Sequence, residues 1–465
     1  MAATNFSGPV VSTNGFTTGS TTLTDSDFAA VQALVSGGGN VAIKRRSLTN
    51  VYTAYPASRL ATEPHSTADR TTNILRVLAA PYLSVRIGIP NFSASNTIAG
   101  CKVCVAPTAD TGAAAGSTNA TYLPSGGTAT FVAATFGGAS SGTLPVANSA
   151  TDESITWTDW IPVQSLDRTD GKPGYPIIVR VLIPGTTAQA GNTNRTVYQS
   201  TGLDDWQDES KVGYRVYRAA RNDNDSVSTV TNWTGNNNSW SDSHQPVLIQ
   251  YMSPVSGVQI TCNGDSITEA PVDAAGGAPV GYNPSFVAAV ALQTATGIPH
   301  ECCNLGVGSS SNAAFLVKWQ RFASAVRPTF AVFSAFSPNL TSHPTAADFA
   351  FMGRKCAEFA ADAAQYGSVP VFVTGIPSTP TTDGEGSTQG KTWTPAEDQA
   401  RIAYNARFTV SGGALCVDAG ALLLGGDSGS NPGQFKMLQA YSLDGLHPNK
   451  AGNTVVGAAL AALLV

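Results

Sequence analysis

One serine in the second half of the chain stands where a nucleophile could act. The run VQITC, typical of a buried strand, breaks into Asn-Gly-Asp and then presents Ser266. Open parallel sheets place functional groups just beyond the carboxyl ends of their strands. A serine after Asn-Gly-Asp is also an ordinary turn or helix-cap residue. Ser266 is therefore a candidate nucleophile whose partners must be found elsewhere in the chain.

The candidate general base is His447. A serine hydroxyl needs a base, and the base needs a group that orients it. Among the five histidines, His447 lies in SLDGLHPNKAG, three residues after Asp444. A tight Asp-Gly-Leu-His loop lets the carboxylate reach Nδ1 of the ring and leaves Nε2 free to face a nucleophile. The alternative is that Asp444 and His447 only cap the last helix.

The other four histidines fit the role of a base less well. His300 follows a proline at the start of the second expected strand, on the edge opposite the site, which favours a structural role. His343 lies in a loop after the third strand and could line a cleft. His65 and His244 lie in the first half of the chain without a nucleophile signature nearby.

Acyl transfer to a serine also requires donors aimed at the developing oxyanion. The second strand ends in NLGVGSSS, where Gly306 and Gly308 can bring a backbone N–H close to a substrate because they have no side chain. The third strand ends in FSAFSPNLTS, where Asn339 offers a side-chain amide. The ends of three strands and the loop before the last helix thus converge on one chemistry.

A second serine motif, GASSG at residues 138–142, fits the G-x-S-x-G pattern of the α/β-hydrolase elbow. That elbow needs a strand before it and a helix after it. Here the motif lies in a Gly/Ser/Thr tract, so a loop is predicted.

The cysteines give no sign of a metal site. Cys101 and Cys104 form a lone C-x-x-C without a second pair at zinc spacing, which favours cysteines in a strand or turn, with or without a local disulfide. We expect no metal site and no cofactor. Small buried thiols are expected at Cys262, Cys302, Cys303 and Cys416.

The pattern of apolar runs changes near residue 250. Before it, short β-branched or aromatic runs alternate with Gly/Ser/Thr/Asn-rich loops, which predicts a β-sandwich or jelly-roll-like domain over residues 46–250. Residues 1–45 are expected to form an N-terminal segment with one short helix. After residue 250, five apolar strands alternate with helical segments. This pattern predicts an α/β fold, namely a three-layer α/β/α domain with a mostly parallel five-stranded sheet over residues 251–465.

The composition excludes some classes of partner. Charged residues make up 12% of the chain, the net charge is -5, and no Lys/Arg cluster offers a footprint for nucleic acid or an anionic membrane. The longest apolar stretch, VVGAALAALLV, is too short to span a bilayer, so we expect no membrane insertion. No secretory signal is expected from the first residues. The Thr/Asn/Gly-rich first half favours an extracellular or virion-associated location.

The four motifs GDSIT, NLGVGSS, SPN and DGLHP, in this order, resemble the blocks of the SGNH or GDSL hydrolase superfamily. The resemblance spans roughly residues 255–465, and its first and last blocks are the most specific. It implies an esterase with a Ser266, His447 and Asp444 triad. It also implies an oxyanion hole of the Ser266 N–H, the Asn339 amide and a glycine N–H.

Two blocks depart from the pattern of this superfamily. The third block usually reads Gly-x-Asn-Asp, whereas this chain has Ser337-Pro338-Asn339-Leu340. The second block is one residue shorter than the common form, so Gly308 is preferred over Gly306 as the donor without excluding it.

The substrate predicted from sequence is an acetylated polysaccharide, as for a carbohydrate esterase. The helix-rich half shows no long apolar lid, and members of the superfamily often remove acetyl groups from polysaccharides. Aromatic faces beside amide and hydroxyl groups suit sugar rings, and five tryptophans fall in the β-rich half: Trp157, Trp160, Trp206, Trp233 and Trp240. They could equally be core residues. Two further classes remain: a general short-chain carboxylesterase or lipase-like enzyme with a structural β domain, and a non-catalytic carbohydrate-binding or virion-surface protein.

Overall fold

A computed structural model describes most of the chain from residue 48 onward. The described residues are 48–60, 70–91, 97–109, 130–147, 154–169, 171, 173–184, 195–196, 217–222, 247–270, 282–308, 310–377, 393–409, 415–427, 435–442 and 444–465. Several sequence predictions lie outside them: the N-terminal segment with its short helix, and the residues His65, His244, Trp206, Trp233 and Trp240.

The carboxyl-terminal part is built on five parallel strands in the order β15-β14-β13-β11-β12. Their bounds are β11 (Leu248–Asn263), β12 (His300–Val307), β13 (Phe330–Ser334), β14 (Val369–Val373) and β15 (Leu415–Val417). Every residue of β12 is buried, as expected for a strand that has both faces of the sheet covered. The predicted mostly parallel five-stranded sheet is confirmed.

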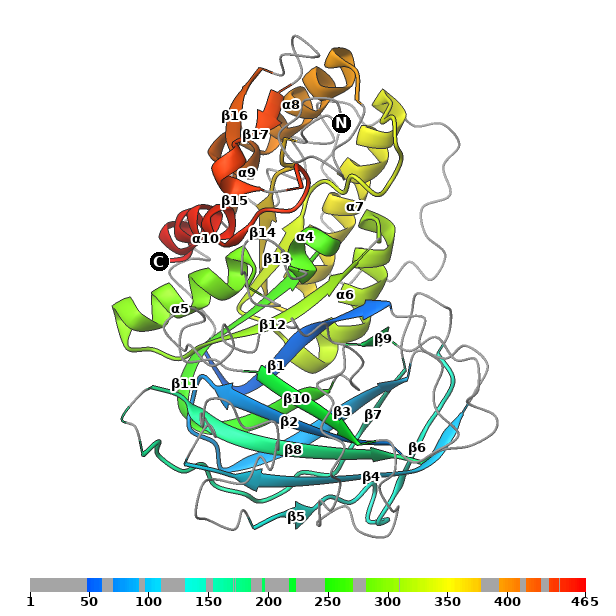
Figure 1. The fold of residues 1–465 in the computed structure, drawn as a ribbon, viewed down its shortest axis with the longest axis vertical. Coiled ribbons are helices and arrows are strands. Elements are labelled where there is room, and N and C mark those ends of the chain that lie inside the picture. The colour runs from blue at the N-terminus through cyan, green and yellow to red at the C-terminus, as the bar shows by residue number, and fades with distance from the viewer. Residues whose placement is uncertain are drawn as a thin grey trace, which may run out of the picture.

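Helices cover both faces of this sheet (Figure 1). One face packs against α5 (Pro284–Thr296) and α10 (Lys450–Leu464), which contribute to a shared apolar core. The other face packs against α6 (Asn312–Val326), α7 (Ala346–Gln365) and α8 (Pro395–Thr409), whose aromatic side chains form a second core. The three-layer α/β/α arrangement predicted for this part is therefore present. A short helix α9 (Ala419–Leu422), the hairpin strands β16 (Leu424–Asp427) and β17 (Phe435–Met437) and the 3-10 turn η3 (Gln439–Tyr441) lie between β15 and α10.

The β-rich part contains two sheets that share one apolar core. One sheet comprises β1 (Thr49–Leu60), β3 (Ser84–Asn91), β7 (Ser154–Trp157), the short β9 (Arg195–Thr196) and the first residues of β11. The other has the order β10-β2-β8-β4-β5, with β6 against β4. Its strands are β2 (Arg70–Leu78), β4 (Ile98–Pro107), β5 (Val132–Ala133), β6 (Gly142–Leu144), β8 (Tyr175–Ile183) and β10 (Tyr217–Asn222). Side chains of β1, β3 and β11 meet those of β2, β4 and β8 in the core between them. A full sandwich or jelly-roll topology stays a prediction, because many connections lie outside the described residues.

Two strands belong to both parts of the molecule. Residues 248–252 of β11 pair antiparallel with β1 and β3, and residues 258–263 of the same strand pair parallel with β12 and β13. Strand β1 also belongs to both parts. Its first half pairs antiparallel with β11, and its residues Tyr55, Pro56 and Ser58 pair parallel with β12. The predicted boundary between residues 250 and 251 thus falls within a continuous strand, and β1 extends the α/β sheet.

A buried polar cluster joins the two parts at Glu301 of β12. Its side chain is fully buried, and its Oε2 accepts hydrogen bonds from the Ala79 N–H at 2.9 Å and the Tyr251 hydroxyl at 2.7 Å. The guanidinium of Arg76 lies 3.5 Å from its Oε1. A buried carboxylate is tolerated only when it is paired and hydrogen-bonded, so partners from the β-rich part keep Glu301 inside the protein.

Two minor predictions from the sequence are settled by the strands. Cys101 and Cys104 lie in β4 as buried thiols that form no disulfide, and burial raises the pKa of each to about 12. Residues 138–142 form a turn that leads into strand β6, so no helix follows the GASSG motif and the predicted loop is confirmed. Among the described helices, none is both long and apolar enough to cross a membrane.

Candidate active site

Ser266 is the first residue of the short helix α4 (Ser266–Glu269), directly beyond the carboxyl end of β11. Asp265 caps this helix, since its carboxylate accepts a hydrogen bond from the Ile267 N–H at 2.9 Å. The turn between strand and helix leaves Ser266 half-buried. The role of helix cap, which was the alternative considered for Ser266, is therefore filled by Asp265. The Ser266 hydroxyl can thus contact another residue.

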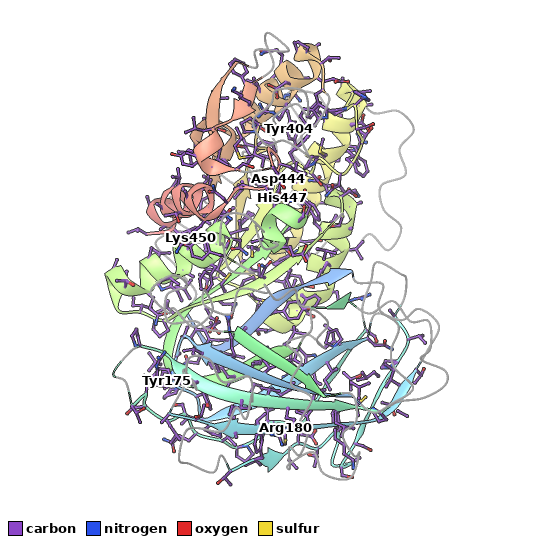
Figure 2. The ribbon with its side chains drawn as sticks, in the orientation of Figure 1. Tyr175, Arg180, Tyr404, Asp444, His447 and Lys450 are labelled. Carbon is purple, nitrogen blue, oxygen red and sulfur yellow. The ribbon has the colours of Figure 1, made fainter. Side chains whose placement is uncertain are left out.

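That partner is the imidazole of His447. Nε2 of the ring lies 2.9 Å from the Ser266 Oγ, and Nδ1 lies 2.6 Å from Oδ2 of Asp444. Asp444 and His447 stand in the loop before α10, next to α4, as Figure 2 shows. The structure thus brings together the three residues that sequence reasoning had selected from separate parts of the chain.

The loop that carries the histidine is held by its own hydrogen bonds. Oδ1 of Asp444 accepts from the N–H groups of Leu446 at 2.9 Å and of His447 at 2.7 Å. The Ser442 hydroxyl donates to the His447 carbonyl at 2.8 Å and accepts from the Gly445 N–H at 3.0 Å. Gly445 has a φ of 73°, a conformation that favours glycine, which explains the glycine in Asp-Gly-Leu-His. Asn449 then caps α10 by accepting from the Gly452 N–H.

This environment favours the ionised form of Asp444. Burial alone raises the pKa of the carboxyl, but the hydrogen bonds and charge of the His447 ring and the backbone N–H groups of Leu446 and His447 outweigh it, and the pKa falls from 3.8 to about 2. An ionised carboxylate on Nδ1 fixes the tautomer in which Nε2 can accept the serine proton.

Gly306 and Gly308 have different roles in the structure. The Gly306 N–H donates to Oδ1 of Asn304 at 2.9 Å, so it is not available to a substrate. A Cβ atom at Gly306 would lie 2.4 Å from the backbone nitrogen of Glu269, which shows that α4 packs directly on this glycine. These contacts favour Gly308 as the oxyanion donor.

Asn339 lies half-buried in the loop after β13, and its amide is partly engaged. Nδ2 donates to the Ser310 carbonyl at 3.1 Å, and the backbone N–H donates to the Ser337 hydroxyl at 3.2 Å. A side-chain amide has two N–H hydrogens, so one remains for a substrate. Because Ser310 follows Gly308 by two residues, this bond also ties the loops of two candidate oxyanion donors together.

The remaining described histidines lie apart from this group. His300 is buried at the start of β12, and its Nδ1 lies 2.7 Å from the Ile298 carbonyl, which fits the structural role expected for it. His343 is 55% exposed, with Nδ1 3.2 Å from Oε1 of Glu397 at the start of α8.

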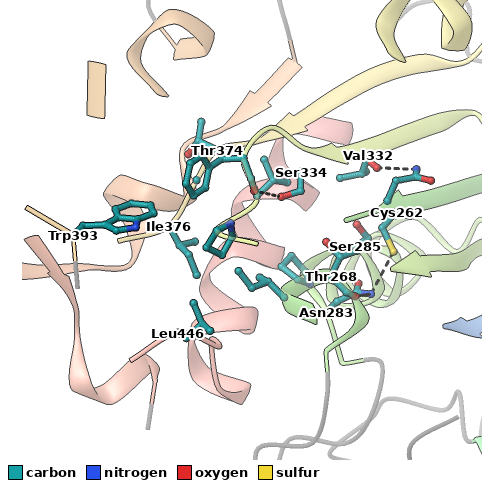
Figure 3. Close-up of a pocket in the computed structure, with 17 residues that line it drawn as sticks. Cys262, Thr268, Asn283, Ser285, Val332, Ser334, Thr374, Ile376, Trp393 and Leu446 are labelled. Carbon is teal, nitrogen blue, oxygen red and sulfur yellow. Dashed lines mark hydrogen bonds between the residues drawn. The ribbon is translucent and has the colours of Figure 1, made fainter. Parts of the chain in front are cut away.

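A pocket opens beside the triad at the carboxyl ends of β11, β13 and β14 (Figure 3). Counted together with the space that is open to solvent, its volume is about 630 Å³. Ile267, which follows Ser266, and Leu446, which precedes His447, both line it. The rest of the wall is mainly apolar and includes Phe336, Pro338, Val373, Ile376 and Trp393.

Sequence reasoning missed three contributors to this region. Trp393 closes the pocket from just before α8, and nothing in its neighbourhood in the sequence signals that position. Ser442 holds the histidine loop, and its place two residues before Asp444 was the available signal. Ser337 contacts several loops, and its signal was the departure from glycine in the third block.

No known protein family and no curated protein matches the chain. Solved structures do resemble it. One is a GDSL-like lipase from Bacteroides thetaiotaomicron, with 14% identity and a TM-score of 0.32 over 44% of this chain and 87% of that one. A lipase/acylhydrolase from Enterococcus faecalis has 18% identity and a TM-score of 0.31 over 44% and 94%. An acetylxylan esterase from Geobacillus stearothermophilus has 15% identity and a TM-score of 0.29 over 46% and 96%. Similarity of this extent concerns the fold, so functional statements depend on the geometry of this chain.

Proposed function

We propose that the chain is a serine ester hydrolase that removes short acyl groups, acetyl above all, from an acylated carbohydrate. One observation carries the proposal: an unbroken hydrogen-bonded line from the Ser266 Oγ through both ring nitrogens of His447 to Asp444, with distances of 2.9 Å and 2.6 Å. A nucleophile, a base and an orienting carboxylate in this order form the arrangement that acyl transfer to serine requires.

The reaction runs in two steps. In the first, Nε2 of His447 takes the proton of Ser266 as its Oγ attacks the ester carbonyl, and the imidazolium then gives that proton to the leaving alcohol. The negative charge on the carbonyl oxygen is stabilised by the N–H groups of Ser266 and Gly308 and by the Asn339 amide. In the second step a water molecule, deprotonated by Nε2 of His447, attacks the acyl-serine; the Oγ–acyl bond then breaks, the imidazolium returns the proton to the Ser266 Oγ, and the acid is released.

The apolar pocket beside Ser266 and His447 is suited to the acyl part of the substrate. Pockets with apolar walls and few polar groups bind small apolar groups by removing them from water. Trp393, Phe336 and Ile376 would contact the methyl end of such a group. The alcohol part would then face solvent, where a polymer has room.

The carbohydrate part of the proposal rests on the sequence, on the low charge and on the Trp/Asn/Ser-rich loops. Of the tryptophans expected to stack on sugars, Trp157 and Trp160 are half-buried, and the guanidinium of Arg86 lies 4.6 Å and 5.0 Å from their ring centroids. Arg86 therefore already occupies a face of each ring, which favours a structural role for this pair. An extracellular or virion-associated location stays part of the proposal.

The test is acetate release from a panel of acetylated polysaccharides and from aryl esters of increasing chain length, by wild type and Ser266→Ala. We expect acetate release that Ser266→Ala abolishes, and rates that fall as the acyl chain outgrows the pocket. Equal activity in Ser266→Ala would contradict the mechanism. Cleavage of aryl acetates without any preference for glycans would favour a general carboxylesterase. Failure of a serine-reactive phosphonate to label Ser266 would favour the non-catalytic binding protein.

A further inference from the structure

Ser337 occupies the position where the GDSL resemblance leads one to expect glycine. It follows β13 by three residues and is only 1% exposed. A buried hydroxyl needs hydrogen-bond partners, because burying it without any is unfavourable. A glycine at this position would need none, so the partners of Ser337 show what the serine adds.

The Ser337 hydroxyl contacts three different loops. Its Oγ lies 2.8 Å from Oδ2 of Asp265 and 3.0 Å from the carbonyl oxygen of Ser310, and it accepts a hydrogen bond from the Asn339 N–H at 3.2 Å. Asp265 precedes Ser266, and Ser310 follows Gly308 by two residues. One hydroxyl thus reaches the segments of all three donors that the proposed reaction assigns to the oxyanion.

We propose that Ser337 is a positioning residue that holds these three loops together so that the oxyanion donors converge. The inference depends on the proposed function for its effect on turnover, but the structural link between the loops does not. Asn339 depends on it most directly, because the backbone N–H of Asn339 and the acceptor of its side chain, the Ser310 carbonyl, both contact the same Oγ.

Two arrangements of protons are compatible with the hydrogen bonds that link Ser337 to Asp265 and Ser310. With Asp265 ionised, the single O–H hydrogen is shared between the Asp265 carboxylate and the Ser310 carbonyl. With Asp265 protonated, its carboxyl donates to the Ser337 Oγ, and Ser337 donates to Ser310. Asp265 is fully buried, and burial raises the pKa of its carboxyl, while hydrogen bonds from Ile267 and Ser337 oppose the rise. In both arrangements, removing the hydroxyl breaks the link between the loops.

The variants Ser337→Ala, Ser337→Gly and Ser337→Thr separate a hydroxyl effect from a packing effect. Ser368→Ala is the matched control, because Ser368 is also a buried serine whose hydroxyl bonds a backbone carbonyl, that of Pro328, but at the amino end of β14. A misplaced oxyanion donor affects the transition state more than bound substrate. We therefore expect Ser337→Ala and Ser337→Gly to lower kcat for an aryl acetate by about 10- to 100-fold with little change in KM. Ser337→Thr should recover most of the loss, and Ser368→Ala should keep the wild-type kcat.

Hydrogen exchange of backbone amides provides a readout that does not need activity. Faster exchange at residues 310–312 and 337–341 is expected in Ser337→Ala and Ser337→Gly, and not in Ser368→Ala. If Ser337→Gly keeps both the wild-type kcat and the wild-type exchange, the inference is wrong. If the loops exchange faster but wild type cleaves no ester, the positioning role stands and the proposed function fails.

Discussion

Asn339 is the residue at which the proposed oxyanion hole is most directly tested. One N–H of its amide is bonded to Ser310, and the other is the proposed donor to the substrate. Loss of one oxyanion donor typically lowers turnover about 100- to 1,000-fold. We expect this fall in kcat for Asn339→Ala on an aryl acetate, with a thermal unfolding midpoint close to that of wild type. Full activity in this variant would remove Asn339 from the site.

Asp444 makes the stability of the protein depend on pH. Its pKa is lowered from 3.8 to about 2 in the folded protein, so folding favours the ionised form. The resulting stabilisation is present above pH 3.8 and is lost as the pH falls through about 2. Because the carboxylate is partly exposed and solvent screens its interactions, the stabilisation is on the order of 1 kcal/mol. We expect Asp444→Asn to lower the free energy of unfolding at neutral pH, and the difference from wild type to shrink as the solution is acidified. Urea unfolding at several pH values measures this, and a constant difference would argue against it.

At the scale of elements, α4 depends on the glycine beneath it. A Cβ at Gly306 would meet the backbone of Glu269 at 2.4 Å, whereas one at Gly308 would meet only the end of the Glu269 side chain. Backbone cannot move aside as a side chain can, and overpacking costs about 1–3 kcal/mol. We expect Gly306→Ala to lower the unfolding midpoint more than Gly308→Ala does. The reverse order in a thermal melt would show that α4 does not pack as described.

The helices and strands show how much of the fold could be predicted from the sequence. The helix α6 coincides with the run NAAFLVKWQRFASAV, and the five parallel strands follow their apolar runs, because both patterns report local burial. The triad was predictable because the nucleophile lies in a distinctive short motif at the end of a strand and the base lies in another in the loop before the last helix. The pairing of β1 with β12 was not predictable, because a sequence pattern shows that a segment forms a strand but not which other strand it pairs with. Nor was the length of β11, which continues through the predicted boundary near residue 250. Trp393 lines the pocket and packs edge-on against Phe336, a contact between distant parts of the chain.

For the whole molecule, the shared strands mean that the α/β part depends on the β-rich part. A chain that starts at residue 251 would lack β1 and β3 and would remove Arg76 and Ala79, partners of the buried Glu301 carboxylate. Removing one partner of a buried ion pair lowers the free energy of unfolding by about 3–5 kcal/mol, which is a large part of the total for a typical domain. We expect this truncated chain not to fold. Circular dichroism and size-exclusion chromatography, with full-length Ser266→Ala as the control, test this. Cooperative unfolding of a soluble truncated chain would contradict the prediction.

The continuity of β11 also bears on how such a chain can evolve. Domains joined by a linker can be exchanged by genetic recombination, because a crossover in the linker disturbs neither fold. A crossover near residue 250 would instead cut a strand that completes two sheets, and β1, which lies some 200 residues earlier, would have to be exchanged with it. The two parts are therefore expected to be inherited together. Substrate preference would then change through the loops at the carboxyl edge of the sheet rather than by replacement of the β-rich part.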